Sequence, residues 1–390
     1  MKPASFQRLA SRMSHIAPFE VMEIQSAARA LALSGKDVIH MEVGEPDFAT
    51  PRPIVDAAID ALNRERMYYT SALGMWPLRE AIADFYRSKY GVEVSPERII
   101  VTAGSSAALL LTCGVLLNSG DEVLMADPGY PCNRHFVRAM EGVPVTIDAG
   151  AENSYQLSAR HVREHWNEKT AAALVASPSN PTGTLIDRAE LKAIHVEVRS
   201  RGGTLIVDEI YQGLTYGVEP STALSLGDDL FVINSFSKYF QMTGWRLGWL
   251  VVPPAYVREV EKLAQNLFIS PSAPAQHAAM AAFHPETLAI LEGRRSEFHA
   301  RRDFLLPALQ SLGYRVPVVP QGAFYIYADS SHIATDSFSL AARILQESYV
   351  AMTPGRDFGR AAPDQHIRIA YTQTVPRLEE AVERMRKVIH

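Results

Sequence analysis

The sequence predicts an α/β protein with a mostly parallel, seven-stranded sheet that carries helices on both faces, together with a smaller α+β domain. Seven short apolar runs, rich in Val, Ile and Leu, support this prediction because they are too short for helices. Most are separated by segments long enough for a crossover helix, which indicates parallel strands buried on both faces. The runs occupy residues 99–103, 122–126, 143–147, 171–176, 204–208, 230–234 and 246–252.

The segments around these runs complete the expected architecture. Apolar residues at helical spacing predict helices before the first run, and alternating strands and helices predict a second domain after the last. Helices are expected over residues 13–35, 51–63, 76–90, 107–117, most of 256–310, 337–349 and 375–389, and further strands over 38–41, 323–328 and 366–371. The expected domains are an N-terminal arm and helix (1–45) that packs with the small domain, a large domain (46–285) and a small C-terminal domain (286–390).

The composition is ordinary for a soluble globular protein of 390 residues, with 47% hydrophobic and 21% charged residues. A formal net charge of −5 gives no reason to expect nucleic acid or an acidic membrane as partner. No apolar run reaches the roughly 18 residues that span a bilayer. The N-terminus lacks a signal-peptide core, so a cytoplasmic protein is expected. Cys113 and Cys132 suggest neither a disulfide framework nor a metal site.

The most informative residue is Lys238, which follows the apolar run at 230–234 and stands between Ser237 and Tyr239. An amine there could form a Schiff base with an aldehyde. Hydroxyls at Ser235 and Ser237, and the guanidinium of Arg246 eight residues later, could grip a phosphate. Pyridoxal 5′-phosphate carries both groups. The alternative is an ordinary surface lysine after a strand.

Two further segments follow predicted strands. Gly104, Ser105 and Ser106 open the helix after the first run, and a helix N-terminus binds phosphate well. A plain N-cap by either serine is the alternative. Asn180 stands between two prolines after the fourth run, where its amide could donate to a phenolic oxygen or serve turn chemistry alone.

Charged residues at two other strands complete the candidate set. Asp208 ends a buried run, where a carboxylate needs a cationic partner such as a protonated pyridine nitrogen. Pairing with a structural arginine or helix capping is the alternative. Tyr211, three residues on, could meet the same ring. Arg368 lies in an alternating strand and could grip a carboxylate with its two-pronged guanidinium, or face solvent.

Taken together, these motifs resemble the fold-type I pyridoxal phosphate enzymes, specifically the class I/II aminotransferases related to aspartate aminotransferase. The resemblance covers nearly the whole chain, from about Pro18 to the C-terminus. It rests on the motifs Asn180-Pro181-Thr182-Gly183, Asp208-Glu209-Ile210-Tyr211 and Ser235-Phe236-Ser237-Lys238, and on Arg368 in its strand.

The resemblance implies a role for each candidate in holding pyridoxal 5′-phosphate. Lys238 would bind the aldehyde and shuttle the proton, and Asp208 would pair with the ring nitrogen. Tyr211 and Asn180 would bond the ring oxygen, and Tyr130 would stack on the ring. The phosphate would be held by Gly104, Ser105, Ser106, Ser235, Ser237 and Arg246.

The resemblance also implies a homodimer with shared active sites. Tyr69 would reach the phosphate of the partner subunit, with Tyr68 as the competing candidate. Arg368, with the Gly44 backbone and Asn180, would bind the substrate carboxylate. The implied reaction is ping-pong transamination between an L-amino acid and a 2-oxo acid.

The side chain of the substrate is left open by the sequence. Many bacterial aspartate aminotransferases carry a lysine where Ser106 stands here, and residues 14–22 are apolar where the family's substrate lid lies. We therefore expect a neutral or aromatic amino donor, with 2-oxoglutarate or pyruvate as acceptor. An aspartate aminotransferase proper and a pyridoxal phosphate-dependent lyase or synthase are the alternatives. A cofactor-binding regulator is not expected, because no DNA-binding module precedes the first helix.

Overall fold

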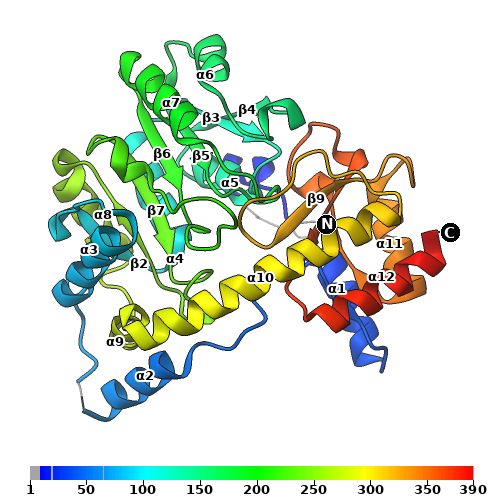
Figure 1. The fold of residues 1–390 in the computed structure, drawn as a ribbon. Helices are drawn as coiled ribbons and strands as arrows, with labels where there is room; N and C mark the ends of the chain where they lie inside the picture. The colour runs from blue at the N-terminus through cyan, green and yellow to red at the C-terminus, as the bar shows by residue number, and fades with distance from the viewer. Residues whose placement is uncertain (1–8, 19–20, 65, 390) are drawn as a thin grey trace, which may run out of the picture.

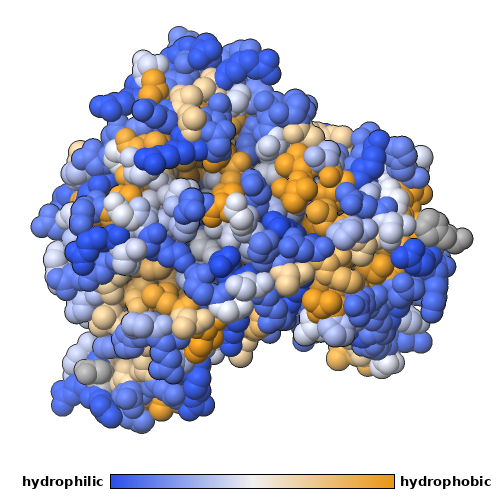
Figure 2. Space-filling model, viewed as in Figure 1, coloured by the Kyte–Doolittle hydropathy of each residue, from blue (hydrophilic) through white to orange (hydrophobic). Residues whose placement is uncertain are grey.

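The computed structural model describes residues 9–18, 21–64 and 66–389. Figure 1 shows two parts, a large sheet surrounded by helices and a smaller group of strands and helices. The long helix α10 (Pro285–Ser311) runs from one part to the other. In Figure 2 the same face is mostly hydrophilic, with hydrophobic residues gathered over the loops around β9. No helix of the described residues is both long and apolar enough to cross a membrane.

The large sheet confirms the predicted fold class. Within the described residues it has seven strands in the order β2-β8-β7-β6-β5-β3-β4. The pairs from β7 to β4 are parallel, whereas β8 is antiparallel to both of its neighbours. The strands are β2 (Ile99–Thr102), β3 (Glu122–Asp127), β4 (Val143–Asp148), β5 (Thr170–Ala176), β6 (Thr204–Asp208), β7 (Phe231–Ser235) and β8 (Gly248–Val251). Each overlaps one predicted apolar run.

Hydrophobic cores lie on both faces of this sheet, as the continuous apolar runs predict. Along β6, Leu205 and Val207 belong to one core and Ile206 belongs to the other, because successive side chains point to opposite faces. The helices of this part are α2 (Arg52–Arg64), α3 (Trp76–Tyr90), α4 (Gly104–Leu116), α5 (Pro131–Ala139), α6 (Ala159–His165), α7 (Arg188–Ser200), α8 (Val257–Leu267) and α9 (Ala273–Met280).

The smaller part is built on a three-stranded antiparallel sheet in the order β11-β12-β9. A separate parallel pair joins β1 (Ile39–His40) to β10 (Val350–Ala351). The remaining elements are β9 (Tyr325–Asp329), β11 (Thr353–Pro354), β12 (His366–Ala370), α11 (Ser337–Ser348) and α12 (Val375–Ile389). The exact division at residues 45/46 and 285/286 stays a prediction, and residues 1–8 of the expected arm lie outside the described residues.

The prediction of a single helix over residues 13–35 is wrong. A short 3-10 helix, η1 (Ser11–His15), comes first, residues 16–18 are not helical, and α1 spans Val21–Leu33. Pro18 explains the break, because the residue before a proline is disfavoured in the helical region. Through Ile24 and Ala28, α1 packs against Leu345 and Ala351 of the smaller part.

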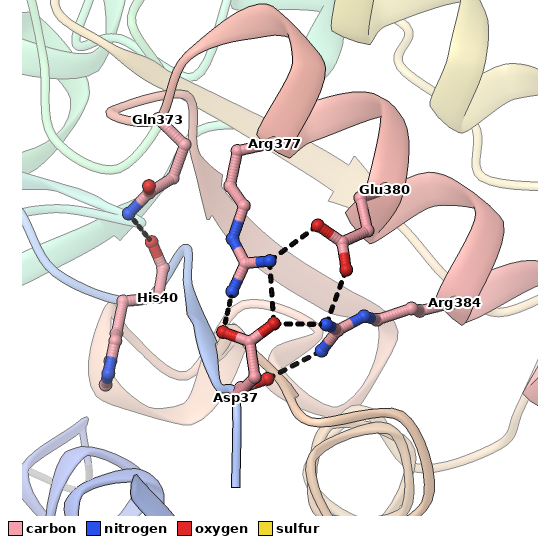
Figure 3. Close-up of polar contacts among 6 residues, drawn as sticks. All are labelled: Asp37, His40, Gln373, Arg377, Glu380 and Arg384. Atoms are coloured by element: carbon pink, nitrogen blue, oxygen red, sulfur yellow. Dashed lines mark hydrogen bonds and ion pairs between the residues drawn. The ribbon is translucent and has the colours of Figure 1, made fainter.

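An ion-pair network ties β1 to the C-terminal helix (Figure 3). Asp37, just before β1, bonds both Arg377 and Arg384 of α12, and the Arg384 Nη2 to Asp37 Oδ2 distance is 2.6 Å. Hydrogen bonds from these guanidinium groups lower the pKa of Asp37 to about 2. Gln373 Nε2 also donates to the His40 carbonyl oxygen at 3.1 Å. The network therefore fixes the strand that leads into the loop at Gly44.

The loop after β1 is held from its other end by α10. The guanidinium of Arg301, which is almost fully buried, binds both carboxylate oxygens of Asp47 at 2.7 and 3.0 Å. The same guanidinium lies over the ring of Phe48, 4.9 Å from its centroid. Arg294 of α10 donates to the carbonyl oxygen of Ala49 at 2.7 Å. Two arginines of one helix therefore set the position of residues 47–49.

Breaking the Arg301–Asp47 pair is expected to destabilise the fold. Asp47→Ala removes two hydrogen bonds to a buried cation. Each such bond contributes about 1.5–3 kcal/mol to the free energy of unfolding. Urea denaturation followed by circular dichroism measures the loss. Asp56→Ala is the matched control, since it breaks the exposed Arg52–Asp56 pair and should change the stability by no more than about 1 kcal/mol. Equal stability of the two variants would contradict the proposed contribution of the Arg301–Asp47 pair.

Candidate active site

A cavity of about 300 Å³ lies where the parallel strands end. Ala176, the last residue of β5, and Asp208, the last residue of β6, both line it. This is the carboxyl edge of an open α/β sheet, where ligands bind. The cavity brings together most of the predicted site residues: Gly44, Ser105, Ser106, Tyr130, Asn180, Asp208, Tyr211, Ser237, Lys238, Arg246 and Arg368.

Lys238 follows β7 and presents its amine inside the cavity. Its Nζ donates to the carbonyl oxygen of Gly44 at 2.5 Å. Burial lowers the pKa of Lys238 to about 8, and the positive charges of Arg368 and Arg246 act in the same direction against the opposing effect of Glu45. A larger share of Lys238 is therefore a neutral nucleophile near neutral pH than for an ordinary lysine.

Asp208 is buried at the end of β6. Burial raises the pKa of its carboxyl to about 6, although the hydrogen bond from the Ile210 N–H (3.0 Å) and the charge of Lys238 oppose this. A buried carboxylate with a neutral hydrogen-bond partner gains from a cationic ligand. The protonated nitrogen of a pyridine ring fits that requirement.

The start of α4 and the segment after β7 form a cradle suited to an anion. Ser105 and Ser106 in the first turn of α4 line the cavity beside Arg246. Gly104 allows Arg246 to lie close to the start of α4. Its φ is +76°, and a Cβ there would stand 2.7 Å from Arg246 Nη2. The Ser237 hydroxyl lines the same space. Backbone amides, hydroxyls and a guanidinium suit the phosphate of pyridoxal 5′-phosphate.

Two predicted phosphate ligands do not line the cavity. Gly104 acts through the space it leaves for Arg246, as described above. Ser235 is fully buried and donates from Oγ to Ser237 Oγ at 2.9 Å. Ser235 therefore orients the hydroxyl of Ser237, which is the group that faces the cavity.

Arg368 of β12 is a buried guanidinium that forms no ion pair with any described residue. It donates to Asn180 Oδ1 at 3.0 Å, to the Glu42 carbonyl oxygen at 2.5 Å and to Thr353 Oγ1 at 3.2 Å. Its Nε is buried and has no hydrogen-bond partner. Because a buried cation is stable only with a counter-charge, Arg368 is suited to bind a carboxylate from outside the chain.

Aromatic side chains enclose the rest of the cavity. Tyr130 and Phe358 line it, and the guanidinium of Arg368 lies 4.9 Å from the centroid of Phe358. Tyr211 Oη and Tyr325 Oη form a hydrogen bond of 2.8 Å. The Cys132 thiol donates to Tyr130 Oη at 3.2 Å. These rings limit the access of water to the amine and supply surfaces on which an aromatic ligand could stack.

Several lining residues were missed from the sequence. Tyr325 stands at the start of β9, in a strand that was predicted without a functional residue. Thr243, Asp357, Phe358 and Glu42 also line the cavity, as do Met22 and Gln25 of α1. Met22 belongs to the apolar segment 14–22, of which residues 19 and 20 lie outside the described residues. These residues belong to no motif, and they come from a strand, a helix and loops that only the folded chain brings together.

Tyr69 and Tyr68 lie outside the cavity, on the connection between α2 and α3. Their side chains are 81% and 67% exposed in the single chain. The geometry of one chain therefore leaves the choice between them open.

With this geometry established, comparison with known proteins identifies the family. Residues 36–385 match the model of the family described as aminotransferase class I and II. The chain belongs to this family. It is thus an aminotransferase of the aspartate aminotransferase-like fold type I group, and the family uses pyridoxal 5′-phosphate.

Relatives of this aminotransferase differ in substrate. It is 36% identical to a (5-formylfuran-3-yl)methyl phosphate transaminase from Methanocaldococcus jannaschii, over 98% of this chain and 100% of the relative. It is 37% identical to a valine–pyruvate aminotransferase from Mycobacterium tuberculosis, over 95% and 96%. A structure of a single mutant of Thermus thermophilus aspartate aminotransferase, 33% identical, superposes with a TM-score of 0.92 over 98% of this chain and all of that one.

The lowered pKa of Lys238 can be tested directly on the cofactor-free aminotransferase. Acylation needs the neutral amine, so labelling of Lys238 is expected to rise with pH through about 8. An ordinary lysine titrates near 10.4. Peptide mass spectrometry after brief labelling measures the midpoint. Arg246→Met removes a nearby positive charge and should move the midpoint to higher pH, whereas a wild-type midpoint near 10 would contradict the effect of burial.

Proposed function

We propose that this aminotransferase carries an amino group from an L-amino acid to a 2-oxo acid by ping-pong transamination, with pyridoxal 5′-phosphate held at Lys238. The observation that supports the proposal is the meeting of three groups in one cavity. These are the amine of Lys238, the buried carboxylate of Asp208 and the guanidinium of Arg368 without a carboxylate partner. Each matches a different charged or reactive group of the cofactor and substrate.

The residues around the cavity suit the cofactor group by group. Asp208 would pair with the ring nitrogen, and Asn180 and Tyr211 would bond the ring oxygen. Ser105, Ser106, Ser237 and Arg246 would hold the phosphate, and Tyr130 would stack on the ring. When bound, the cofactor supplies an aldehyde that takes up the amino group and a ring that accepts the electron pair released at the substrate α-carbon.

Lys238 is proposed to move the proton of the substrate α-carbon. Because burial lowers its pKa to about 8, a larger share of Lys238 would be neutral near pH 7 than of an ordinary lysine, and a base requires the neutral amine. The Gly44 carbonyl oxygen would hold Nζ in place whenever the amine is free of the cofactor. Arg368 would orient the substrate by gripping its α-carboxylate with two parallel hydrogen bonds, so that the α-carbon faces Lys238.

The charges of the cavity support a neutral amino donor. Among the described lining residues the basic side chains are Lys238, Arg246 and Arg368, and each has a role already. Ser106 adds no charge, so a second carboxylate would lack a cationic partner. We therefore propose an aliphatic or aromatic donor with pyruvate or 2-oxoglutarate as acceptor, of which pyruvate fits the charges better. Valine–pyruvate transamination by the Mycobacterium tuberculosis relative agrees with this choice, and aspartate is the alternative that the Thermus thermophilus relative suggests.

A homodimer with shared active sites is also proposed. Tyr68 and Tyr69 are large, exposed side chains, and Leu62 at 58% exposure lies close to them in the sequence. Exposed apolar groups near one another are typical of a protein interface. A second copy of the chain would cover them and bring Tyr69 to the phosphate of its neighbour.

A half-reaction screen tests the function and its chemistry. The cofactor-loaded protein is mixed with single amino acids, and the absorption of the bound cofactor is expected to convert to that of pyridoxamine phosphate with release of the matching 2-oxo acid. Lys238→Ala should lower the rate at least about 100-fold, because the base is lost. Lys192→Ala, an exposed change on α7, is the control and should leave the rate unchanged. Substantial turnover by Lys238→Ala would remove Lys238 from the reaction.

Replacing Arg368 separates substrate binding from the chemical step. Arg368→Lys keeps the charge but loses the two-pronged grip on a carboxylate, so KM is expected to rise about 10- to 100-fold for every amino acid. Steady-state kinetics with two donors of different side chain measures this. Arg160→Lys on the exposed face of α6 serves as the control. An unchanged KM would place the carboxylate elsewhere.

A further inference from the structure

Tyr325, which the sequence did not single out, lies at the junction of three site groups. It is fully buried at the start of β9 and lines the cavity. Its Oη stands 2.8 Å from Tyr211 Oη. The guanidinium of Arg368 lies over the ring of Tyr325, and the distance from Arg368 Cζ to the ring centroid is 4.5 Å. Its hydroxyl also packs against Gly44, where a Cβ would come within 2.3 Å of Oη.

Either tyrosine can donate the hydrogen bond between them, and a bound cofactor would determine which one does. A phenol hydroxyl carries one proton and can accept from another donor at the same time. If Tyr211 gives its proton to the ring oxygen of the cofactor, it has none left for Tyr325. Tyr325 must then be the donor of the 2.8 Å bond, and Tyr211 the acceptor.

We propose that Tyr325 is a positioning residue that, by donating to Tyr211, directs the Tyr211 proton to the ring oxygen of the cofactor. The inference rests on the proposed function, because it requires the cofactor at Lys238. Tyr325 acts through Tyr211 and touches no reacting atom. A hydroxyl that accepts a hydrogen bond becomes a stronger donor, so the chain of two bonds stabilises negative charge on the ring oxygen more than Tyr211 could alone.

The surroundings of Tyr325 hold its hydroxyl in place for this role. The backbone of Gly44 closes one side, which leaves no room for a side chain at that position. The pairing of β9 with β12 places Tyr325 opposite Ala370, two residues from Arg368 on the same face of the sheet. Stacking on Arg368 therefore fixes the ring, and packing on Gly44 fixes the direction of the hydroxyl.

The test is an absorbance titration of the protein loaded with pyridoxal 5′-phosphate. Donation to the ring oxygen favours the deprotonated form of the bound chromophore. Tyr325→Phe removes only the donating hydroxyl, so the midpoint of the titration is expected to rise by about 0.5 to 1 pH unit. An unchanged midpoint would overturn the inference.

Two controls make the readout specific. Tyr327→Phe removes a similarly buried hydroxyl from the same strand; Tyr327 does not line the cavity, so this variant should leave the midpoint unchanged. In Tyr211→Phe the acceptor is absent, so adding Tyr325→Phe should produce no further shift. Additive shifts in the double variant would show that Tyr325 acts independently of Tyr211 and would overturn the proposal.

A second measurement separates positioning from general damage. The ring of Tyr325→Phe still stacks on Arg368, so the dissociation constant of a monocarboxylate with an apolar side chain, such as 4-methylvalerate, should change less than about twofold. A large loss of inhibitor affinity together with the shift would indicate a disturbed site and contradict the proposed route. If wild-type protein does not bind pyridoxal 5′-phosphate at Lys238, the proposed function fails, and this outcome is distinct from failure of the Tyr325 role alone.

Discussion

Two carbonyl oxygens of a single loop hold the two cations on which the site depends. The Glu42 carbonyl accepts from Arg368, which comes from the small sheet, and the Gly44 carbonyl accepts from Lys238, which follows the large sheet. The loop therefore contacts both parts of the protein and links Arg368 of the small sheet to Lys238 after the large sheet. Because the buried Arg301 and the surface pairs of Asp37 fix its two ends, the spacing between amine and guanidinium is set by groups that lie outside the cavity.

Burial also brings the pKa values of Asp208 and Lys238 closer together. An ordinary aspartate and an ordinary lysine differ by more than about six pH units in pKa. In this cavity the pKa of Asp208 is about 6 and that of Lys238 about 8, mainly because both charged forms lose water. A ligand that brings a ring cation to Asp208 and takes up the amine of Lys238 would relieve both penalties. These two burial penalties therefore favour tight retention of such a ligand.

The sequence predicted the parts of the site that follow strand ends. Lys238 and Asp208 stand directly after apolar runs, and the carboxyl edge of a parallel sheet gathers such residues without knowledge of side-chain packing. Tyr325 could not be found in this way, because its bond to Tyr211 joins residues 114 positions apart and depends on how the small sheet meets the large one. The supporting role of Ser235 is likewise a matter of side-chain direction. The predicted helix over residues 13–35 failed for a local reason, the proline at 18, which the apolar pattern alone obscured.

The pairing of β1 with β10 has a consequence for how the chain folds as it is made. Ile39 lies beside Val350, more than 300 residues later, whereas the large sheet is complete once Val251 has emerged. Loops of this length close slowly, and domains fold largely in the order of synthesis. The loop that presents Gly44 is therefore expected to be fixed only after Val350 and Ala351 have emerged. A growing polypeptide would hold a folded large sheet with an incomplete cavity until Val350 and Arg368 have been made.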